Sequence, residues 1–316
     1  MLLDISGVNA MITALAGGVG ASKLLVGVTR IVDPTELTVI VNTGDDIQLH
    51  GLHISPDLDI VTYSLAEIVD ETKGWGIEGD TFNALNALKR FTTGEWFNLG
   101  DKDLATHIFR TEQLKKGKTL TEITREICIA LKLRAAILPM TDGKFETRIV
   151  TPAGTIHFEE YMVKNRAKDE VLGVEFFGAE TAKPSAGVLE AIENTQLVVL
   201  CPSNPIVSIG TILSVKGIRD SLKKSSAKKV GVSPIIGGMP IKGPADKLLR
   251  GLGHEASAFG TAELYADFLD EFVIDVQDAS EKQRIERLGI KVKVANTVMK
   301  TLEDKVQLAR IVLGQE

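Results

Sequence analysis

The sequence contains little that would place the protein outside the cytoplasm. Its two cysteines, Cys128 and Cys201, are too few for a disulfide framework and form no CxxC pair. Both stand in apolar surroundings, so we expect them to be reduced and buried. No apolar run approaches the ~20 residues that span a bilayer. The first residues also lack the charged and apolar regions of a signal peptide. These absences predict a cytoplasmic protein.

An excess of basic residues is missing as well. The net charge of −6 argues against a general nucleic-acid binder, because neutralising many phosphates needs a basic surface. A single nucleotide held by a local site remains compatible with this charge. The hydrophobic content of 44% is ordinary for a globular protein of 316 residues.

The order of apolar patterns predicts the fold class. Buried-strand patterns alternate with helical ones along most of the chain, which is typical of a Rossmann-like, doubly wound and mostly parallel α/β sheet. We expect one α/β domain over residues 11–316, preceded by a dispensable N-terminal extension, residues 1–10. A mainly helical lobe is expected at about 70–131 and a β-hairpin region at about 145–163, turning at Pro152–Gly154.

Several helix boundaries can be predicted from capping residues. Asp80 is expected to cap a helix that runs to Arg90, and Asp101 to cap one that runs through Arg110. Thr119 and Glu122 have the spacing of a capping box at the start of a helix to residue 131. Near the C-terminus, helices are predicted at 262–268 and 280–287.

A glycine-rich turn follows the first predicted strand. Gly17, Gly18, Val19 and Gly20 separate that strand from a helix at 21–32. A strand, a glycine turn and a helix together bring backbone N–H groups and a helix dipole to a phosphate. Neither the dinucleotide fingerprint nor the P-loop is matched fully, because Lys23 stands where the fingerprint has its third glycine. The alternative is a glycine turn needed only for tight packing.

Four carboxylates crowd the loop after the second predicted strand, Val39–Val41. They are Asp45, Asp46, Asp57 and Asp59. In an open α/β sheet this loop faces the crevice where ligands bind. Carboxylates gathered there repel one another unless a cation or a proton relieves them. The pattern indicates a site for a hard divalent cation and a hydroxyl-bearing ligand; the alternative is a solvated acidic turn with capping aspartates.

Two further loops carry candidate ligand contacts. Trp75 lies between glycines in the loop 72–80, where it either plugs a core edge or offers a flat surface to an aromatic ligand. Ser203, Asn204 and Ser208 follow the strand predicted at 196–201. Their side chains suit a sugar, a phosphate or a base edge, or else ordinary turn and cap chemistry.

Together these segments resemble one protein family. The resemblance is carried by AGGVGASK at 16–23, NTGDD at 42–46, HGLHISPDLD at 50–59, GWG at 74–76, LGDKDLATH at 99–107, PSNPIVSIG at 202–210 and SPIIG at 233–237. Each motif is weak alone, but all seven stand in the order of the 2-phospholactate transferase (CofD) family, from about Met11 to the C-terminus. Lys102 departs from the family pattern, which usually has arginine there; lysine lacks the bidentate fork of a guanidinium.

The resemblance implies a step in making coenzyme F420. The family moves a phospholactyl-type group, or a phosphoenolpyruvyl group, from a guanosine diphosphate ester onto the deazaflavin Fo. GMP is released, and Mg²⁺ assists the reaction. It also implies a homodimer. The nearest alternative is a nucleotide-sugar-binding metabolic regulator of the same fold, and a nicotinamide-dependent dehydrogenase is a third class that the broken fingerprint disfavours.

Roles for individual residues follow from this reading. Asp45 and Asp46 are expected to be catalytic and to hold Mg²⁺, which prefers one or two carboxylates together with phosphate oxygens. Any of the four aspartates is a candidate for accepting the hydroxyl proton. Around Fo we expect Asp57, Asp59, Trp75 and Lys102. The phosphates and the guanosine are expected at Gly17, Gly18, Val19, Gly20, Ser203, Asn204, Pro205, Ser208, Ser233 and Pro234.

Overall fold

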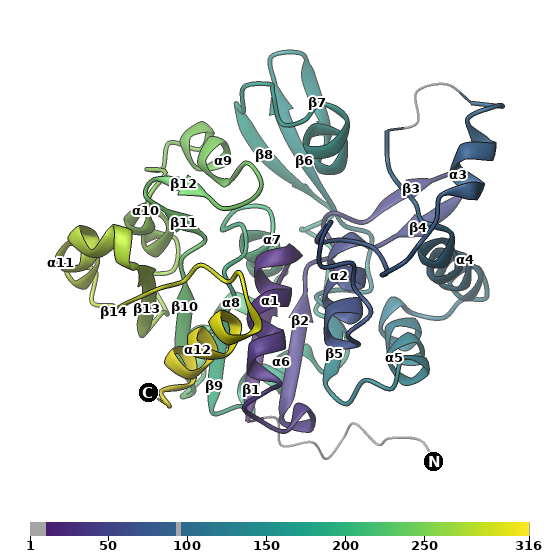
Figure 1. Ribbon diagram of the computed structural model, residues 1–316. Helices are drawn as coiled ribbons and strands as arrows, with labels where there is room; N and C mark the ends of the chain where they lie inside the picture. The colour runs from purple at the N-terminus through teal and green to yellow at the C-terminus, as the bar shows by residue number, and fades with distance from the viewer. Residues whose placement is uncertain (1–10, 93–95, 316) are drawn as a thin grey trace.

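A seven-stranded parallel sheet forms the centre of the molecule (Figure 1), in a computed structural model that describes residues 11–92 and 96–315. The strand order is β14-β13-β10-β9-β1-β2-β5. The strands are β1 (Ile12–Ala16), β2 (Leu37–Val41), β5 (Ala136–Pro139), β9 (Leu197–Leu200), β10 (Lys228–Val232), β13 (Glu271–Asp275) and β14 (Lys291–Ala295). This is a Rossmann-like doubly wound order: successive strands are added outward on one side of β1 as far as β5, and then on its other side starting with β9, which runs parallel to β1. The predicted fold class is confirmed.

Both faces of the sheet are covered, because alternate strand side chains point into two separate apolar cores. On one face Leu15 and Ile40 belong to the core that includes α6 (Val188–Glu193), α8 (Ile218–Lys224) and α10 (Ala258–Glu263). On the other, Ala14 and Val39 pack with α1 (Gly18–Val28), α2 (Pro56–Leu65) and α12 (Leu302–Leu313). Burial on both faces explains why the strands are almost continuously apolar. Cys128 and Cys201 are buried free thiols, as expected.

Three helices lie on the β5 side of the sheet (Figure 1). They are α3 (Asn83–Leu88), α4 (Asp101–Lys115) and α5 (Leu120–Ala130), and α5 packs on β5. The capping box of Thr119 and Glu122 is present at the start of α5. Two short antiparallel strands, β3 (Ile47–Leu49) and β4 (Leu52–Ile54), extend the acidic loop toward α4.

The predicted caps of α3 and α4 are wrong. Asp80 was expected to cap α3 and Asp101 to cap α4, but each aspartate caps the other helix. The Asp101 carboxylate accepts hydrogen bonds from the backbone N–H groups of Asn83 and Ala84, both at 3.0 Å, at the start of α3. The Asp80 carboxylate accepts from the N–H groups of Lys102 and Asp103, at 2.8 and 3.1 Å, at the start of α4. A capping residue close in space but 17 to 23 positions away along the chain leaves no local pattern in the sequence.

A three-stranded antiparallel sheet stands above the carboxyl edge of the main sheet (Figure 1). It is formed by β6 (Glu146–Thr151), β7 (Gly154–His157) and β8 (Gly173–Phe177). The hairpin pattern predicted to residue 163 ends at His157, and a single π-helical turn, Glu160–Lys164, follows. π-Helical turns are frequent at functional sites.

The remaining differences lie in short C-terminal helices. The helix predicted at 262–268 is α10, which starts earlier because Ser257 caps the N–H of Gly260. The helix predicted at 280–287 is a 3₁₀ turn at Val276–Glu281 followed by α11 (Lys282–Glu286). The expected extension, residues 1–10, lies outside the described residues. Across the part of the chain that is described, no helix has both the length and the apolarity needed to cross a membrane.

Candidate active site

Two loops meet at the point where the strand order reverses. The glycine turn follows β1, and the segment 202–208 follows β9, which is the neighbour of β1 in the sheet. The Gly17 N–H donates a hydrogen bond to Ser203 Oγ at 3.2 Å and joins the two loops. Ligands of open α/β sheets bind in the crevice outside this point. Sequence segments 186 residues apart are thereby brought to one site.

Two glycines of the turn are required by packing within the protein. A Cβ at Gly17 would lie 2.6 Å from Asp57 Oδ2, and one at Gly20 would overlap the carbonyl oxygen of Pro202. Close packing therefore accounts for these two glycines without any ligand. Gly18 differs, since its φ of +73° favours glycine while a Cβ there would meet only Asp57 Oδ1, at 3.7 Å. Gly18 and Val19 open α1, where N–H groups and the helix dipole attract anions, and the Asp57 carboxylate already accepts a hydrogen bond from the Gly18 N–H.

The acidic loop folds into a buried cluster beside this turn. Asp57 Oδ2 accepts a hydrogen bond from Asn42 Nδ2 at 2.9 Å, and the same amide group donates to the carbonyl of Val207 at 3.2 Å. Asn42 thus ties the end of β2 to the loop after β9. Asp46 Oδ2 contacts His53 Nε2 and accepts from Ser55 Oγ, both at 2.8 Å. The four aspartates are buried, so the solvated acidic turn is excluded.

Two carboxylate oxygens in the cluster have no partner. Asp45 Oδ1 and Asp46 Oδ1 are buried without a hydrogen bond within the described residues. Burial, then the charges of Asp57 and Glu159, raise the pKa of Asp45 well above its usual value. A buried carboxylate without a donor is costly. Each of these two oxygens could therefore be stabilised by a proton or a cation.

Glu159 is a member of this cluster that the sequence analysis missed. It lies between β7 and the π-helical turn and is 7% exposed. Burial, with the charges of Asp57 and Asp46, raises its pKa to about 8. Burial also raises the pKa of Asp57 to about 7, against the Asn42 hydrogen bond that lowers it. Glu159 follows an irregular strand end about a hundred residues after the aspartates, and no spacing rule connects the two.

These raised pKa values predict how stability depends on pH. Asp57 and Glu159 keep their protons to higher pH in the folded protein than in the unfolded chain, where both lose them near pH 4. Between about pH 4 and pH 8 the folded state binds more protons, so these groups make the metal-free protein less stable as pH rises. We expect Asp57→Asn to remove part of this loss when Tm is measured from pH 5 to 8.

The comparison with the variant is needed because another group acts in the opposite direction. Burial lowers the pKa of His157, so His157 favours the folded state as pH rises through the same range. The informative quantity is the difference in slope between wild type and Asp57→Asn. Equal slopes for the two proteins would contradict the buried, protonated state of Asp57.

A cavity of about 280 Å³ opens beside the cluster. Trp75 forms part of its wall, and its ring meets that of Phe82 edge to face at 6.3 Å between centroids. The cavity is lined by Ile54, Pro56, Asp59, Ile60, Tyr63, Trp75, Gly76, Phe97, Asn98, Asp103, His107, Glu159 and Val163. Its mixture of flat apolar walls and a few polar groups is typical of a small-molecule site.

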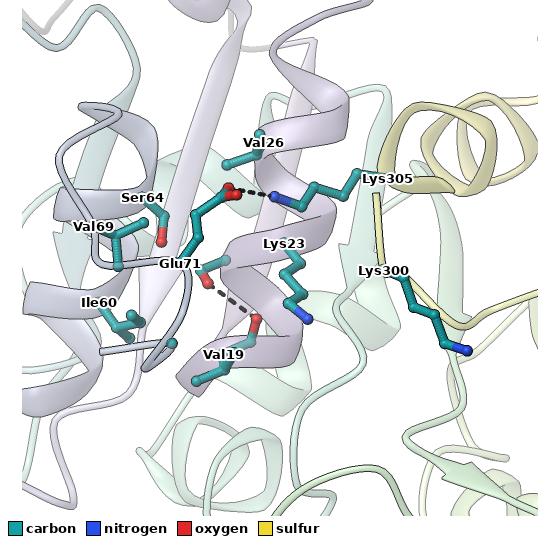
Figure 2. Close-up of a pocket in the computed structure, with 11 residues that line it drawn as sticks. Val19, Lys23, Val26, Ile60, Ser64, Val69, Glu71, Lys300 and Lys305 are labelled. Carbon is teal, nitrogen blue, oxygen red and sulfur yellow. Dashed lines mark hydrogen bonds and ion pairs between the residues drawn. The ribbon is translucent and has the colours of Figure 1, made fainter. Parts of the chain in front are cut away.

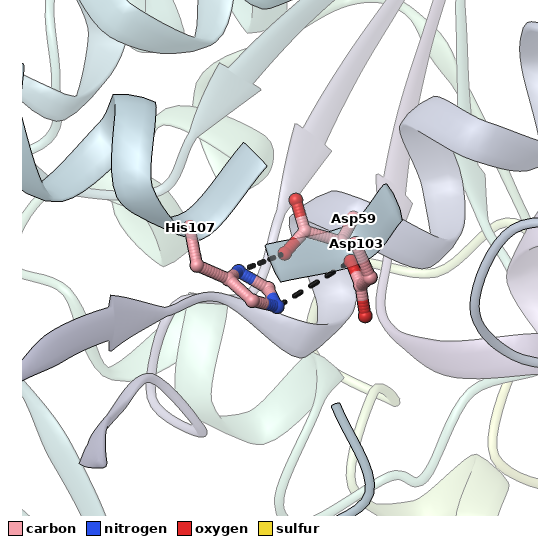
Figure 3. Close-up of side chains that lie close together, drawn as sticks. All are labelled: Asp59, Asp103 and His107. Carbon is pink, nitrogen blue, oxygen red and sulfur yellow. Dashed lines mark ion pairs between the residues drawn. The ribbon is translucent and has the colours of Figure 1, made fainter. Parts of the chain in front are cut away.

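The polar floor of this cavity is a buried network (Figure 3). Both guanidinium ends of Arg110 donate to the two oxygens of Asp59, and Arg110 Nη1 also contacts His107 Nδ1 at 3.3 Å. Asp103 accepts from the Tyr63 hydroxyl at 2.7 Å and lies 3.4 Å from His107 Nε2. Ligand atoms of Asp59, Asp103 and His107 lie within 4.8 Å of one another, as in a metal site. Because the Arg110 fork already occupies Asp59, a cation would be repelled here.

The other predicted ligand residues are placed less centrally. The Lys102 ammonium donates to the carbonyl of Glu78 at 2.8 Å and is not part of the cavity lining. Asn204 Oδ1 accepts from the N–H groups of Ile206 and Val207, and Ser233 Oγ bonds within its own turn to Ile235. Such local bonds are ordinary turn chemistry.

Lys23 lies on the flank of α1 that faces Lys300 and Lys305 (Figure 2). Its ammonium donates to the carbonyl of Met299 at 3.1 Å, on the side of α1 that faces α12. A small cavity of about 80 Å³ lies there, where Lys305 pairs with Glu71 at 2.8 Å. This cavity is separate from the acidic cluster.

Solved structures share the fold at low sequence identity. A Bacillus halodurans protein of the UPF0052 family matches with a TM-score of 0.64 and 16% identity, covering 96% of this chain and 98% of that one. At this identity the likeness concerns the fold alone.

Sequence comparisons identify the family. The family model described as 2-phospho-L-lactate transferase CofD matches residues 12–310. The chain is 43% identical to the 2-phospho-L-lactate transferase of Methanosarcina mazei over 94% of this chain and 98% of that protein. It is 42% identical to the phosphoenolpyruvate transferase of Kitasatospora aureofaciens over 96% and 97%, respectively. With its α/β fold and acidic crevice, the chain belongs to the 2-phospho-L-lactate transferase (CofD) family.

Proposed function

We propose that this transferase moves a phospholactyl-type group from a guanosine diphosphate ester onto a hydroxyl of the deazaflavin Fo, releasing GMP, as a step in making coenzyme F420. The observation that carries the proposal is the buried cluster of Asp45, Asp46, Asp57 and Glu159 directly beside the glycine turn. A phosphate seat and a site for a cation and a proton acceptor are thereby adjacent, as phosphoryl transfer requires.

The donor is assigned to the crevice between the glycine turn and the loop after β9. Its diphosphate would lie at the N-terminus of α1, and its guanosine along Ser203, Asn204, Pro205 and Ser208, with Ser233 and Pro234 beyond. The hydrogen bond from the Gly17 N–H to Ser203 Oγ holds the two loops together and supports this placement. The Asn204 side chain is already used to fix its own turn, so it would contribute to guanosine binding by holding the backbone of this loop in place.

Mg²⁺ fits the carboxylates that are present. Asp45 and Asp46 each keep one buried oxygen without a hydrogen bond, and Mg²⁺ prefers one or two carboxylates plus phosphate oxygens. When bound, the ion would offset the charge of the phosphate oxygens and of the cluster. The contacts of Asp46 with His53 and Ser55 fix the direction in which its free oxygen points.

The transfer itself exchanges one P–O bond for another. The Fo hydroxyl oxygen attacks the phosphorus that bears the lactyl group, the bond to GMP breaks, and the hydroxyl proton passes to a carboxylate. Asp57 and Glu159 are suited to accept it, because their pKa values of about 7 and about 8 lie near the working pH of a general base. Asp59 is less suited, since Arg110 holds both of its oxygens.

The acceptor is assigned to the cavity with Trp75 in its wall. Asp59 lines this cavity, whereas the Asp57 carboxylate lies beside Gly17 and Gly18 and is not part of the lining. Lys102 would reach Fo only after releasing the Glu78 carbonyl. We further propose a homodimer in the cytoplasm, which light scattering and cell fractionation would test.

One assay tests the reaction and the acyl group together. Purified protein is incubated with Fo, Mg²⁺ and each guanylated donor in turn: phospholactate, phosphoenolpyruvate and phosphoglycerate. Mass spectrometry then identifies the products. We expect GMP and a phosphodiester that joins Fo to the organic acid of the donor, from at least one donor. Relatives carry the names of both the phospholactate and the phosphoenolpyruvate enzyme. No product from any donor would overturn the proposal.

Substitution of Gly18 tests the proposed phosphate-binding site at the N-terminus of α1. A valine there would place a branched side chain where a ligand phosphate approaches the backbone, so we expect Gly18→Val to abolish donor binding. Since φ is +73°, any side chain also strains the fold by about 1–2 kcal/mol. Calorimetry with GDP on Gly18→Ala, which carries the same backbone strain with less bulk, separates the two effects. If Gly18→Val bound GDP as tightly as wild type, phosphate binding at this turn would be contradicted.

A further inference from the structure

The floor of the Trp75 cavity contains a hydrogen-bond donor beside an acceptor, and both are buried. His107 lines the cavity and is 1% exposed; its Nε2 makes no hydrogen bond within the described residues, although Asp103 Oδ1 lies 3.4 Å away. Asp103, one helical turn earlier on α4, is 8% exposed. A buried polar atom without a partner is costly, so its presence in a cavity wall indicates a ligand that completes it.

The protonated nitrogen of His107 can be assigned from Arg110. A guanidinium has no acceptor, so its contact with His107 Nδ1 at 3.3 Å requires that Nδ1 accept. The proton of the neutral ring is then on Nε2, which faces Asp103 (Figure 3). Arg110 is in turn fixed by both oxygens of Asp59. Arg110 is therefore a positioning residue behind the cavity wall.

Asp103 supplies the acceptor. Its Oδ1 accepts a hydrogen bond from the Tyr63 hydroxyl at 2.7 Å, whereas Oδ2 has no hydrogen bond to another described residue. Burial raises the pKa of Asp103, but the His107 ring 3.4 Å away, the Tyr63 hydroxyl and the charge of Arg110 together lower it. The carboxylate is therefore ionised near neutral pH and offers Oδ2 as an acceptor only.

We propose that His107 Nε2–H and Asp103 Oδ2 read the C(=O)–N–H edge of a flat heterocycle that lies against Trp75. The His107 N–H donates to the ring carbonyl, and the ring N–H donates to Asp103. A pyrimidinedione edge has these two groups side by side, and a deazaflavin carries such an edge. The identity of the ring rests on the proposed function; the donor and acceptor pattern does not.

Methylation of the ligand provides the sharpest test. Wild-type protein is titrated with Fo and with Fo methylated at its imide nitrogen, and binding is followed by tryptophan fluorescence without donor or turnover. Wild type should bind the methylated ring about ten- to a hundredfold more weakly, the range for one hydrogen bond to a charged group. Asp103→Asn should bind Fo about as weakly as wild type binds the methylated ring. The same variant should lose most of the discrimination between the two ligands.

Two further variants separate recognition from folding. His107→Gln keeps an N–H donor and should retain Fo affinity within a few-fold, whereas His107→Leu should lose it. Glu112→Gln, an exposed change on the same helix, is the matched control and should match wild type. Equal affinity of wild type for Fo and methylated Fo, with turnover intact, would overturn this inference alone. Failure of wild type to bind Fo at all would overturn both the inference and the proposed function.

Discussion

Asp45→Asn and Asp46→Asn should each lose transferase activity while the protein stays folded. Each change removes the negative charge from one of the two unpartnered oxygens that would bind the cation. Losing several kcal/mol of charge stabilisation corresponds to a rate reduced by about a thousandfold. The measurement is kcat with Fo, the guanylated donor and saturating Mg²⁺. Full Mg²⁺-dependent turnover by both variants would reject the role in metal binding.

Although Asp45→Asn should lose activity, it should not lower the stability of the protein. In the metal-free protein, burial, followed by the charges of Asp57 and Glu159, disfavours an ionised Asp45. A neutral amide avoids this penalty, so Tm should stay constant or rise. Added Mg²⁺ should raise the Tm of wild type and should have little effect on the variant. Asp220→Asn, on the exposed face of α8, is a matched control that should change neither quantity. A fall in Tm with lost activity would indicate a structural role instead.

How much of this site the sequence could predict depends on the distance over which each feature acts. The glycine turn, the four aspartates and the loop after β9 directly follow strands, and parallel strands bring their carboxyl ends to one edge. Their meeting at the β1–β9 reversal therefore follows from the fold class alone. The bond from Gly17 to Ser203 is the result.

Features that depend on side-chain partners far along the chain were missed or misplaced. Asp80 and Asp101 both have the local look of a helix cap, but each caps the other's helix. Glu159 joins the aspartates only because the antiparallel sheet stands over the crevice, and no periodicity encodes that placement. The sequence analysis also included Asp59 with the other three aspartates as a candidate proton acceptor. Only the fold reveals that Arg110 occupies it.

Arg110→Met should be strongly destabilising, because it leaves Asp59 charged and buried without its partner. Arg110 is 1% exposed and Asp59 6%. Although burial opposes it, Asp59 raises the pKa of Arg110, so the pair is ionised. Breaking one side of such a pair costs about 3–5 kcal/mol. Urea unfolding should show a lower midpoint with an unchanged m-value.

The double variant Asp59→Leu with Arg110→Met should recover most of that stability, since replacing both members of a buried pair by apolar groups is often neutral. Its binding of Fo should nevertheless remain weak, because His107 loses the contact that keeps its proton on Nε2. A single variant as stable as wild type would contradict the ion pair. Recovered stability together with recovered Fo binding would show that the pair only supports the fold. Stability regained without binding would mean that the charges at this position are retained for recognition, at no gain to the fold.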